Sequence, residues 1–143
     1  MKSALFAISV LLGLAACQTT TVSAPSASSA VSRDAILAAT TASELLALGA
    51  RRLNGPDIRA ELVGQKLSEG SWTWNINSDG TANSAAADGT WESTSVWDIV
   101  GNQYCRQGED APRKCSDVYE QDGIYRFSET ESELAGWAVS VVQ

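Results

Sequence analysis

SWTWNINSDG, residues 71–80, is the segment from which the architecture of this chain can be worked out. Its first six residues alternate, so that Trp72, Trp74 and Ile76 share one face of a predicted strand. The four residues that follow, 77–80, are typical of a tight turn. A strand with one apolar face that runs directly into such a turn predicts the first arm of an antiparallel hairpin.

The same pattern continues to the end of the chain. Runs rich in Trp, Tyr, Val, Ile and Thr lie at 90–94, 96–104, 115–120, 124–127 and 137–142, and turn residues lie at 88–89, 101–102 and 121–123. About six short strands joined by tight turns predict an antiparallel meander, because such strands pair with their neighbours along the chain. Curling or closing the meander into a small barrel would hide its exposed edges.

Three short helices are predicted before this β region. Ser32 can cap the first helix, and Thr41 with Glu44 forms a capping box for the second. Pro56 suits the first turn of the third helix, which Gly64 ends. The predicted fold class is therefore α+β, mainly β: short N-terminal helices are followed by an antiparallel β meander or a small, partly closed barrel.

The N-terminus carries a targeting signal. Lys2 precedes an apolar run of about 11 residues, whereas a spanning helix needs about 20. The run ends in Leu14-Ala15-Ala16-Cys17, which resembles the lipobox of bacterial lipoprotein precursors. The resemblance implies cleavage before Cys17 and acyl chains, palmitate among them, on its sulfur. The alternative is an ordinary secretory signal peptide that is cut near Ala16 and leaves Cys17 free.

The lipoprotein resemblance also implies a place in the cell. Two or three acyl chains make a stable anchor, and Gln18 after the cysteine implies transfer to the outer membrane, at its periplasmic face. We therefore expect a signal peptide at 1–16, a lipidated cysteine and flexible tether at 17–32, and a single β-rich globular domain at 33–143.

A second resemblance covers most of 53–137. Gly89-Thr90-Trp91, then Tyr104-Cys105-Arg106, and then a second cysteine are similar to features of small uncharacterised exported proteins of alphaproteobacteria. This resemblance supports the predicted architecture and implies no active site.

The composition of the chain argues against several classes of function. The formal net charge is −7 and Lys and Arg do not cluster, which argues against a nucleic-acid partner. The chain has no histidine, so Ser-His-Asp and Cys-His mechanisms are excluded and the commonest zinc ligand is missing. Lys66 and Lys114 remain after cleavage, and neither lies in a nucleophile motif. We therefore expect no enzyme activity, no metal and no cofactor.

Cys105 and Cys115 form a natural pair once Cys17 is assigned to lipid. An oxidising periplasm favours a disulfide between them, and closing a loop of about 11 residues is worth about 3 kcal/mol in the chain-entropy model. The alternative, a metal site, lacks further ligands.

The candidate binding residues are aromatic or cationic. The five tryptophans are Trp72, Trp74, Trp91, Trp97 and Trp137. They can line a pocket, but a small domain also uses its largest side chains to build a core, and we favour the core. Arg106, Arg113 and Lys114 lie in or beside the cysteine loop. They can hold an anionic ligand or an acidic partner surface, although we expect them to pair with Glu109, Asp110 and Asp117.

These features predict a lipid-anchored cell-envelope protein that acts as a non-catalytic binding or interaction module, inhibitor-like in one version. The alternative is a carrier of a small apolar ligand with a Trp-lined barrel interior. A carrier needs an enclosed apolar cavity of at least about 300 Å³. The expected partners are the membrane, through acyl chains on Cys17, and an envelope protein or a small apolar ligand, but no nucleic acid.

Overall fold

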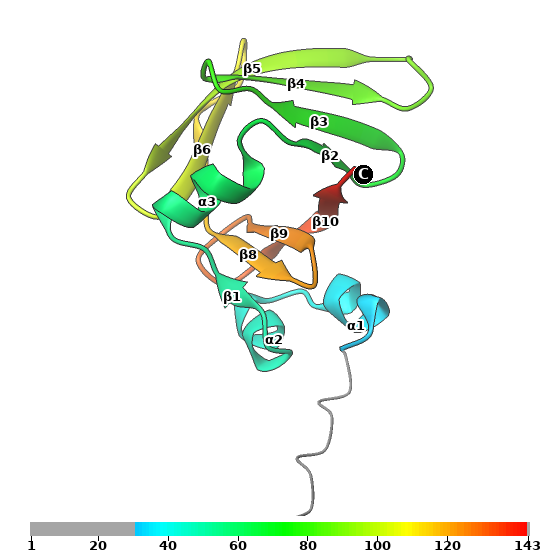
Figure 1. Ribbon diagram of the computed structural model, residues 1–143, viewed down its shortest axis with the longest axis vertical. Helices are drawn as coiled ribbons and strands as arrows, with labels where there is room; N and C mark the ends of the chain where they lie inside the picture. The colour runs from blue at the N-terminus through cyan, green and yellow to red at the C-terminus, as the bar shows by residue number, and fades with distance from the viewer. Residues whose placement is uncertain (1–30, 143) are drawn as a thin grey trace, which may run out of the picture.

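A curled antiparallel sheet dominates the computed structural model, which describes residues 31–142 (Figure 1). The predicted signal peptide, the lipobox and almost all of the predicted tether lie outside the described residues. The helices are α1 (Arg33–Ala38), α2 (Ala42–Ala47) and α3 (Gly55–Leu62). The strands are β1 (Arg51–Arg52), β2 (Lys66–Ser68), β3 (Trp72–Ile76), β4 (Thr81–Ala86), β5 (Glu92–Val100), β6 (Gln103–Gly108), β7 (Lys114–Ser116), β8 (Val118–Gln121), β9 (Ile124–Ser128) and β10 (Leu134–Val141).

The described strands form one sheet in the order β1-β8-β9-β10-β2-β3-β4-β5-β6-β7, and every neighbouring pair is antiparallel. The sheet curls into a half-barrel (Figure 1). The predicted α+β, mainly β fold is thus confirmed. The strands outnumber the six or so expected. The predicted run 115–120 is divided at Asp117 into β7 and β8, and β6 extends beyond the predicted run 96–104. Strands β1, β2 and β4 were not predicted, because β1 and β2 are only two or three residues long and β4 has no aromatic and only one β-branched residue.

A corner at Asp117 bends the sheet. Strands β7 and β8 stand at different places in the strand order, yet only Asp117 separates them in the chain. The buried Ser128 braces this bend: its hydroxyl accepts from the Asp117 N–H at 2.7 Å, and its own N–H donates to the Asp117 carbonyl at 2.9 Å. The Ser116 hydroxyl donates to the Ser128 carbonyl at 2.7 Å. Strand β7 pairs with β6 and strand β8 pairs with β9, so the chain changes its pairing partner at this corner without an intervening loop.

The curled sheet separates two apolar cores. The larger lies inside the half-barrel and under α3, with Ile58, Leu62, Trp74 and Phe127 among its members. The smaller holds α1 and α2 against the β8–β10 part of the sheet (Figure 1). Strand β9 is buried along its whole length because it contributes side chains to both cores.

Arg126 ties the N-terminal helices to the sheet. It lies in β9 and is almost completely buried. Its guanidinium donates to the carbonyls of Ile36 at 2.7 Å, Leu37 at 3.1 Å and Ala39 at 3.0 Å, and to that of Ala135 at 3.0 Å. The last carbonyls of a helix have no partner within the helix, so this one side chain satisfies the end of α1.

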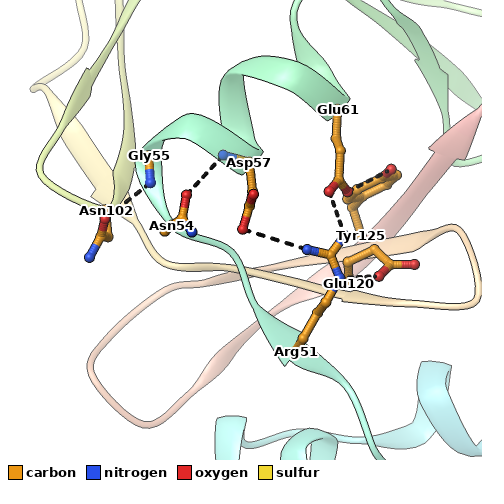
Figure 2. Close-up of polar contacts among 8 residues, drawn as sticks. All are labelled: Arg51, Asn54, Gly55, Asp57, Glu61, Asn102, Glu120 and Tyr125. Atoms are coloured by element: carbon orange, nitrogen blue, oxygen red, sulfur yellow. Dashed lines mark hydrogen bonds and ion pairs between the residues drawn. The ribbon is translucent and has the colours of Figure 1, made fainter.

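The helix caps follow the sequence prediction. The Ser32 hydroxyl accepts from the Ala35 N–H at 3.2 Å, and Thr41 and Glu44 form the predicted capping box. The first turn of α3 is additionally fixed from outside, since the Gly55 N–H donates to Asn102 Oδ1 at 3.0 Å (Figure 2). Asn102 lies in the β5–β6 turn, so α3 is anchored to the strands that carry part of the candidate site described below.

Arg51 gathers three carboxylates at the other side of α3 (Figure 2). Its guanidinium pairs with Glu120 at 2.9 Å, with Asp57 at 3.7 Å and with Glu61. The Tyr125 hydroxyl donates to the second Glu61 oxygen at 3.3 Å. These contacts link β1, α3, β8 and β9, and they account for the acidic side chains here as a structural ion-pair cluster.

We predict that Gly55→Ala destabilises the protein by about 1–3 kcal/mol, a typical cost of overpacking. A Cβ at this position would lie 2.5 Å from the Gly101 carbonyl oxygen, a backbone atom that cannot easily move. Helix propensity alone predicts that Gly55→Ala raises the stability, because Ala is the better helix former. Urea unfolding monitored by circular dichroism measures the change.

Gly136→Ala is the matched control, because a Cβ there meets no atom within 4 Å and the backbone needs no positive φ. Its unfolding free energy should stay level or rise slightly. Equal stability of the two variants would show that α3 does not press against the β5–β6 turn.

Candidate functional site

Aromatic rings fill the concave side of the half-barrel. The members are Trp72, Trp74, Trp97, Tyr104, Phe127 and Trp137. Trp74 is the central ring: it meets Tyr104 edge-on at a centroid distance of 5.2 Å, Phe127 at 5.5 Å and Trp137 at 6.2 Å. Ring pairs of this kind are worth about 0.5–1.5 kcal/mol beyond the area they bury. The cluster therefore acts first as a core, as the sequence analysis favours.

Four of the five predicted tryptophans take part in this cluster. Trp97 stacks on Tyr104 at 5.9 Å, and its Nε1–H is shared between the carbonyls of Asn77 and Thr81, each at 2.9 Å. Trp91 does not take part, because β5 begins one residue after it and its side chain is 47% exposed at the end of the β4–β5 hairpin. The favoured expectation that the five tryptophans build the core therefore holds for four of them and is wrong for Trp91, which is also outside the pocket described next.

A pocket of about 160 Å³ opens beside the rings. Trp74, Tyr104, Phe127 and Trp137 form its aromatic wall. Its polar wall comes from β6, β7 and the end of β9, through Arg106, Lys114, Ser116, Ser128 and Glu129. The pocket thus brings strands from both halves of the bent sheet to one place.

A second hollow of about 320 Å³ shares part of this lining. Ser84, Ser93 and Ser95 of β4 and β5 line it, together with Arg106 and Lys114. The two cations therefore stand between an aromatic surface and a surface of hydroxyl groups.

Arg106 and Lys114 are direct cross-strand partners on β6 and β7. Side chains at such positions leave the sheet on the same face, with Cβ atoms about 4.5–5.5 Å apart. Two like charges in this arrangement are destabilising. The next pair along the ladder is Cys105 and Cys115, which the structure joins as a disulfide with a sulfur–sulfur distance of 2.00 Å. This covalent bond fixes the register that places the two cations opposite each other.

Arg106 has no carboxylate within ion-pair distance among residues 31–142. Its guanidinium instead lies over the Trp74 ring, 5.7 Å from the ring centroid. Among the residues that the structure describes, Lys114 pairs with Glu129 alone, at 3.4 Å, and both side chains are exposed. An exposed pair of this kind contributes little, so neither cation is firmly neutralised.

The expected ion pairs of the cysteine loop are wrong. Neither Glu109 nor Asp110 forms an ion pair with a described residue. Asp117 pairs instead with Arg52 at 2.7 Å, and Arg113 pairs with Asp98 at 2.5 Å. Asp117 does not pair with the cations of the cysteine loop because the β7–β8 corner turns it toward Arg52 in β1.

Two buried hydrogen-bond donors of the aromatic wall lack a partner. Trp74 Nε1 and the Tyr104 hydroxyl are both covered, and neither has an acceptor in the described part of the chain. An unsatisfied buried polar group costs about 1–3 kcal/mol. Burial raises the pKa of the Tyr104 hydroxyl well above its ordinary value, so this group is neutral at physiological pH.

Residues 31–142 contain no group of three or more Cys, Asp or Glu side chains placed to hold a metal ion. No helix in the same range has the length and apolar character to cross a bilayer.

No family model, curated protein or solved structure matches this chain. The function must therefore be argued from the geometry of the concave face.

We predict that Tyr104→Phe leaves the unfolding free energy unchanged or raises it by up to about 1 kcal/mol. The substitution deletes a buried hydroxyl without a partner and keeps the ring that Trp74 and Trp97 pack against. Urea unfolding at neutral pH measures the effect.

Tyr125→Phe is the matched control. Its hydroxyl donates to Glu61 at 3.3 Å, so this variant should lose about 0.5–1.5 kcal/mol. A loss of the same size in Tyr104→Phe would mean that the Tyr104 hydroxyl is hydrogen-bonded in solution.

Proposed function

We propose that this protein is a lipid-anchored, non-catalytic binding module of the bacterial cell envelope, and that it holds its ligand on the concave face of the half-barrel. One observation carries the proposal: Arg106 and Lys114 stand side by side at an aromatic pocket, and Arg106 has no carboxylate partner in the described residues. In a chain with an excess of acidic side chains, such cations are available to bind something else.

A carrier with a Trp-lined interior is less well supported. The rings are packed against one another at centroid distances of 5.0–6.5 Å, and the pocket beside them is about 160 Å³. That volume falls short of the roughly 300 Å³ or more that small-molecule pockets commonly have, and the adjoining hollow of about 320 Å³ is lined by serines and cations with no aromatic ring. The aromatic residues therefore serve better as one wall of a small site than as the lining of an enclosed chamber.

A catalytic role is also less well supported. The raised pKa of Tyr104 keeps its hydroxyl protonated and makes it a weaker acid, so it can serve neither as a general base nor as a ready proton donor near neutral pH. General acid–base chemistry needs a group whose pKa lies near the working pH. Binding does not require a group with such a pKa, because an ion pair and contact with the rings are enough to hold a ligand.

The lipobox at Leu14-Ala15-Ala16-Cys17 supports the anchored state. In the proposal, acyl chains on Cys17 hold the protein at the periplasmic face of the outer membrane, and the uncharged segment before Arg33 lets the domain stand away from the lipid. The acyl chains, rather than the acidic domain, make the membrane contact.

The anchoring part is tested by expressing the full chain in a Gram-negative bacterium fed with an alkyne fatty acid. The wild-type protein and Cys115→Ser should take up the label and fractionate with the outer membrane. Cys17→Ser should be unlabelled and soluble. An unlabelled wild-type protein, or a labelled Cys17→Ser variant, would contradict the anchor.

The binding part is tested on the same preparations by native mass spectrometry. Wild-type protein incubated with the low-mass fraction of an envelope extract should form a one-to-one adduct that is not converted to a product. The double variant Arg106→Gln/Lys114→Gln should lose the adduct. Equal adduct formation by both proteins would contradict the concave face as the binding surface, and turnover would contradict a non-catalytic module.

A further inference from the structure

We propose that the concave site binds a small carboxylate built on one six-membered ring, with the ring against the aromatic wall and the carboxylate between Arg106 and Lys114. This inference rests on the proposed function, which leaves the chemistry of the ligand open. It follows from the charge, the volume and the hydrogen-bonding groups of the site.

The charge of the site requires an anion. Arg106 and Lys114 are cross-strand partners and both line the pocket, so a negative group between them would relieve their repulsion. A guanidinium presents parallel donors that match the two oxygens of a carboxylate, and an ammonium adds a point charge. The only carboxylate that reaches either cation within residues 31–142 is Glu129, through an exposed contact at 3.4 Å that a ligand can displace.

The volume of the site limits the ligand to one ring. A dry protein cavity of about 150 Å³ accommodates one benzene molecule. The pocket beside Trp74, Phe127 and Trp137 measures about 160 Å³. A second ring would have to leave the aromatic wall for the adjoining hollow, which is lined by serines and the two cations with no ring among them.

The uncharged groups suit the oxygens of such a ligand. Trp74 Nε1 and the Tyr104 hydroxyl are donors without acceptors among the described residues, and both side chains line the pocket. Both atoms are covered, so the proposal requires that the side chains over them move when the ligand binds. The Arg106 guanidinium, 5.7 Å from the Trp74 ring centroid, is one group that would shift toward the carboxylate. Ser93 in the adjoining hollow can meet polar substituents of the ring.

An aromatic ring and a sugar ring offer the same binding features. Both are six-membered, both pack on indole and phenyl faces, and both can carry a carboxylate. Benzoate and glucuronate therefore serve as the two arms of the test. Acetate supplies the carboxylate without the ring, benzyl alcohol supplies the ring without the charge, and inorganic phosphate supplies charge alone.

Isothermal titration calorimetry on the acylated full chain in detergent, at low salt, measures these affinities. Benzoate or glucuronate should bind at least about tenfold more tightly than acetate, benzyl alcohol or phosphate. Arg106→Gln should weaken this binding by about tenfold or more, since it removes a charged hydrogen-bond donor. Tyr104→Phe should weaken it by about threefold to tenfold without loss of stability.

Arg113→Gln is the matched control for charge. It removes a cation from the same loop, but Arg113 pairs with Asp98 and does not line the aromatic pocket. It should change the affinity by less than about twofold. An equal loss of affinity in Arg113→Gln and Arg106→Gln would mean that the anion is held by non-specific electrostatic attraction, and this result would overturn the site.

The remaining outcomes separate this inference from the proposed function. Equal binding of acetate or phosphate would overturn recognition of the ring, and equal binding of benzyl alcohol would overturn recognition of the anion. If neither ring carboxylate binds while the envelope extract gives an adduct, the ligand class is wrong and the binding module stands. If the extract also gives no adduct, both proposals fail.

Discussion

A covalent bond beside two like charges is the constraint on which the candidate site depends. The Cys105–Cys115 disulfide lies next to the Arg106–Lys114 pair on the same two strands. Closing this short loop stabilises the fold by about 3 kcal/mol, whereas like charges opposite each other on a sheet cost about 0.2–1 kcal/mol. The stabilisation by the disulfide therefore outweighs the repulsion. It holds the two cations opposite each other, although their like charges favour separation.

The bend of the sheet gives these cations their aromatic neighbours. Ser128 braces the corner at Asp117, so the chain passes from the side of β6 to the side of β9. As a result Phe127 comes to lie 6.0 Å from Tyr104, between ring centroids, and the two halves of the half-barrel share one aromatic cluster. Arg126, next to Phe127 in β9, points to the other core and fastens α1. One strand thus supports both the concave site and the N-terminal helices.

Local sequence signals predicted the elements they control directly. The alternation around Trp74 predicted β3, residues 77–80 predicted the turn after it, and Thr41 with Glu44 predicted the cap of α2. The strands β1, β2 and β4 were not predicted. β1 and β2 are two or three residues long and are strands because another segment pairs with them, which no local pattern reports. β4 has the sequence TANSAA, with no aromatic and only one β-branched residue, so its composition does not indicate a strand.

The candidate site was predictable in part. Trp74, Trp137 and Arg106 are among the residues predicted from the sequence. The pairing of Arg106 with Lys114 could have been predicted from the sequence. A disulfide that joins positions 105 and 115 on facing antiparallel strands places residue 106 opposite residue 114. The unpartnered Tyr104 hydroxyl could not, since its environment is assembled from rings on several strands. The predicted ion pair of Asp117 failed because the β7–β8 corner turns that side chain toward Arg52.

A double-mutant cycle on protein stability tests the central claim most directly. The free energies of unfolding of wild type, Arg106→Gln, Lys114→Gln and the double variant give the coupling between the two cations. With the disulfide intact, the two cations should show a repulsive coupling of about 0.2–1 kcal/mol at low salt, which shrinks as salt is added. A coupling of zero, or an attractive one, would contradict two opposed charges held together by the disulfide.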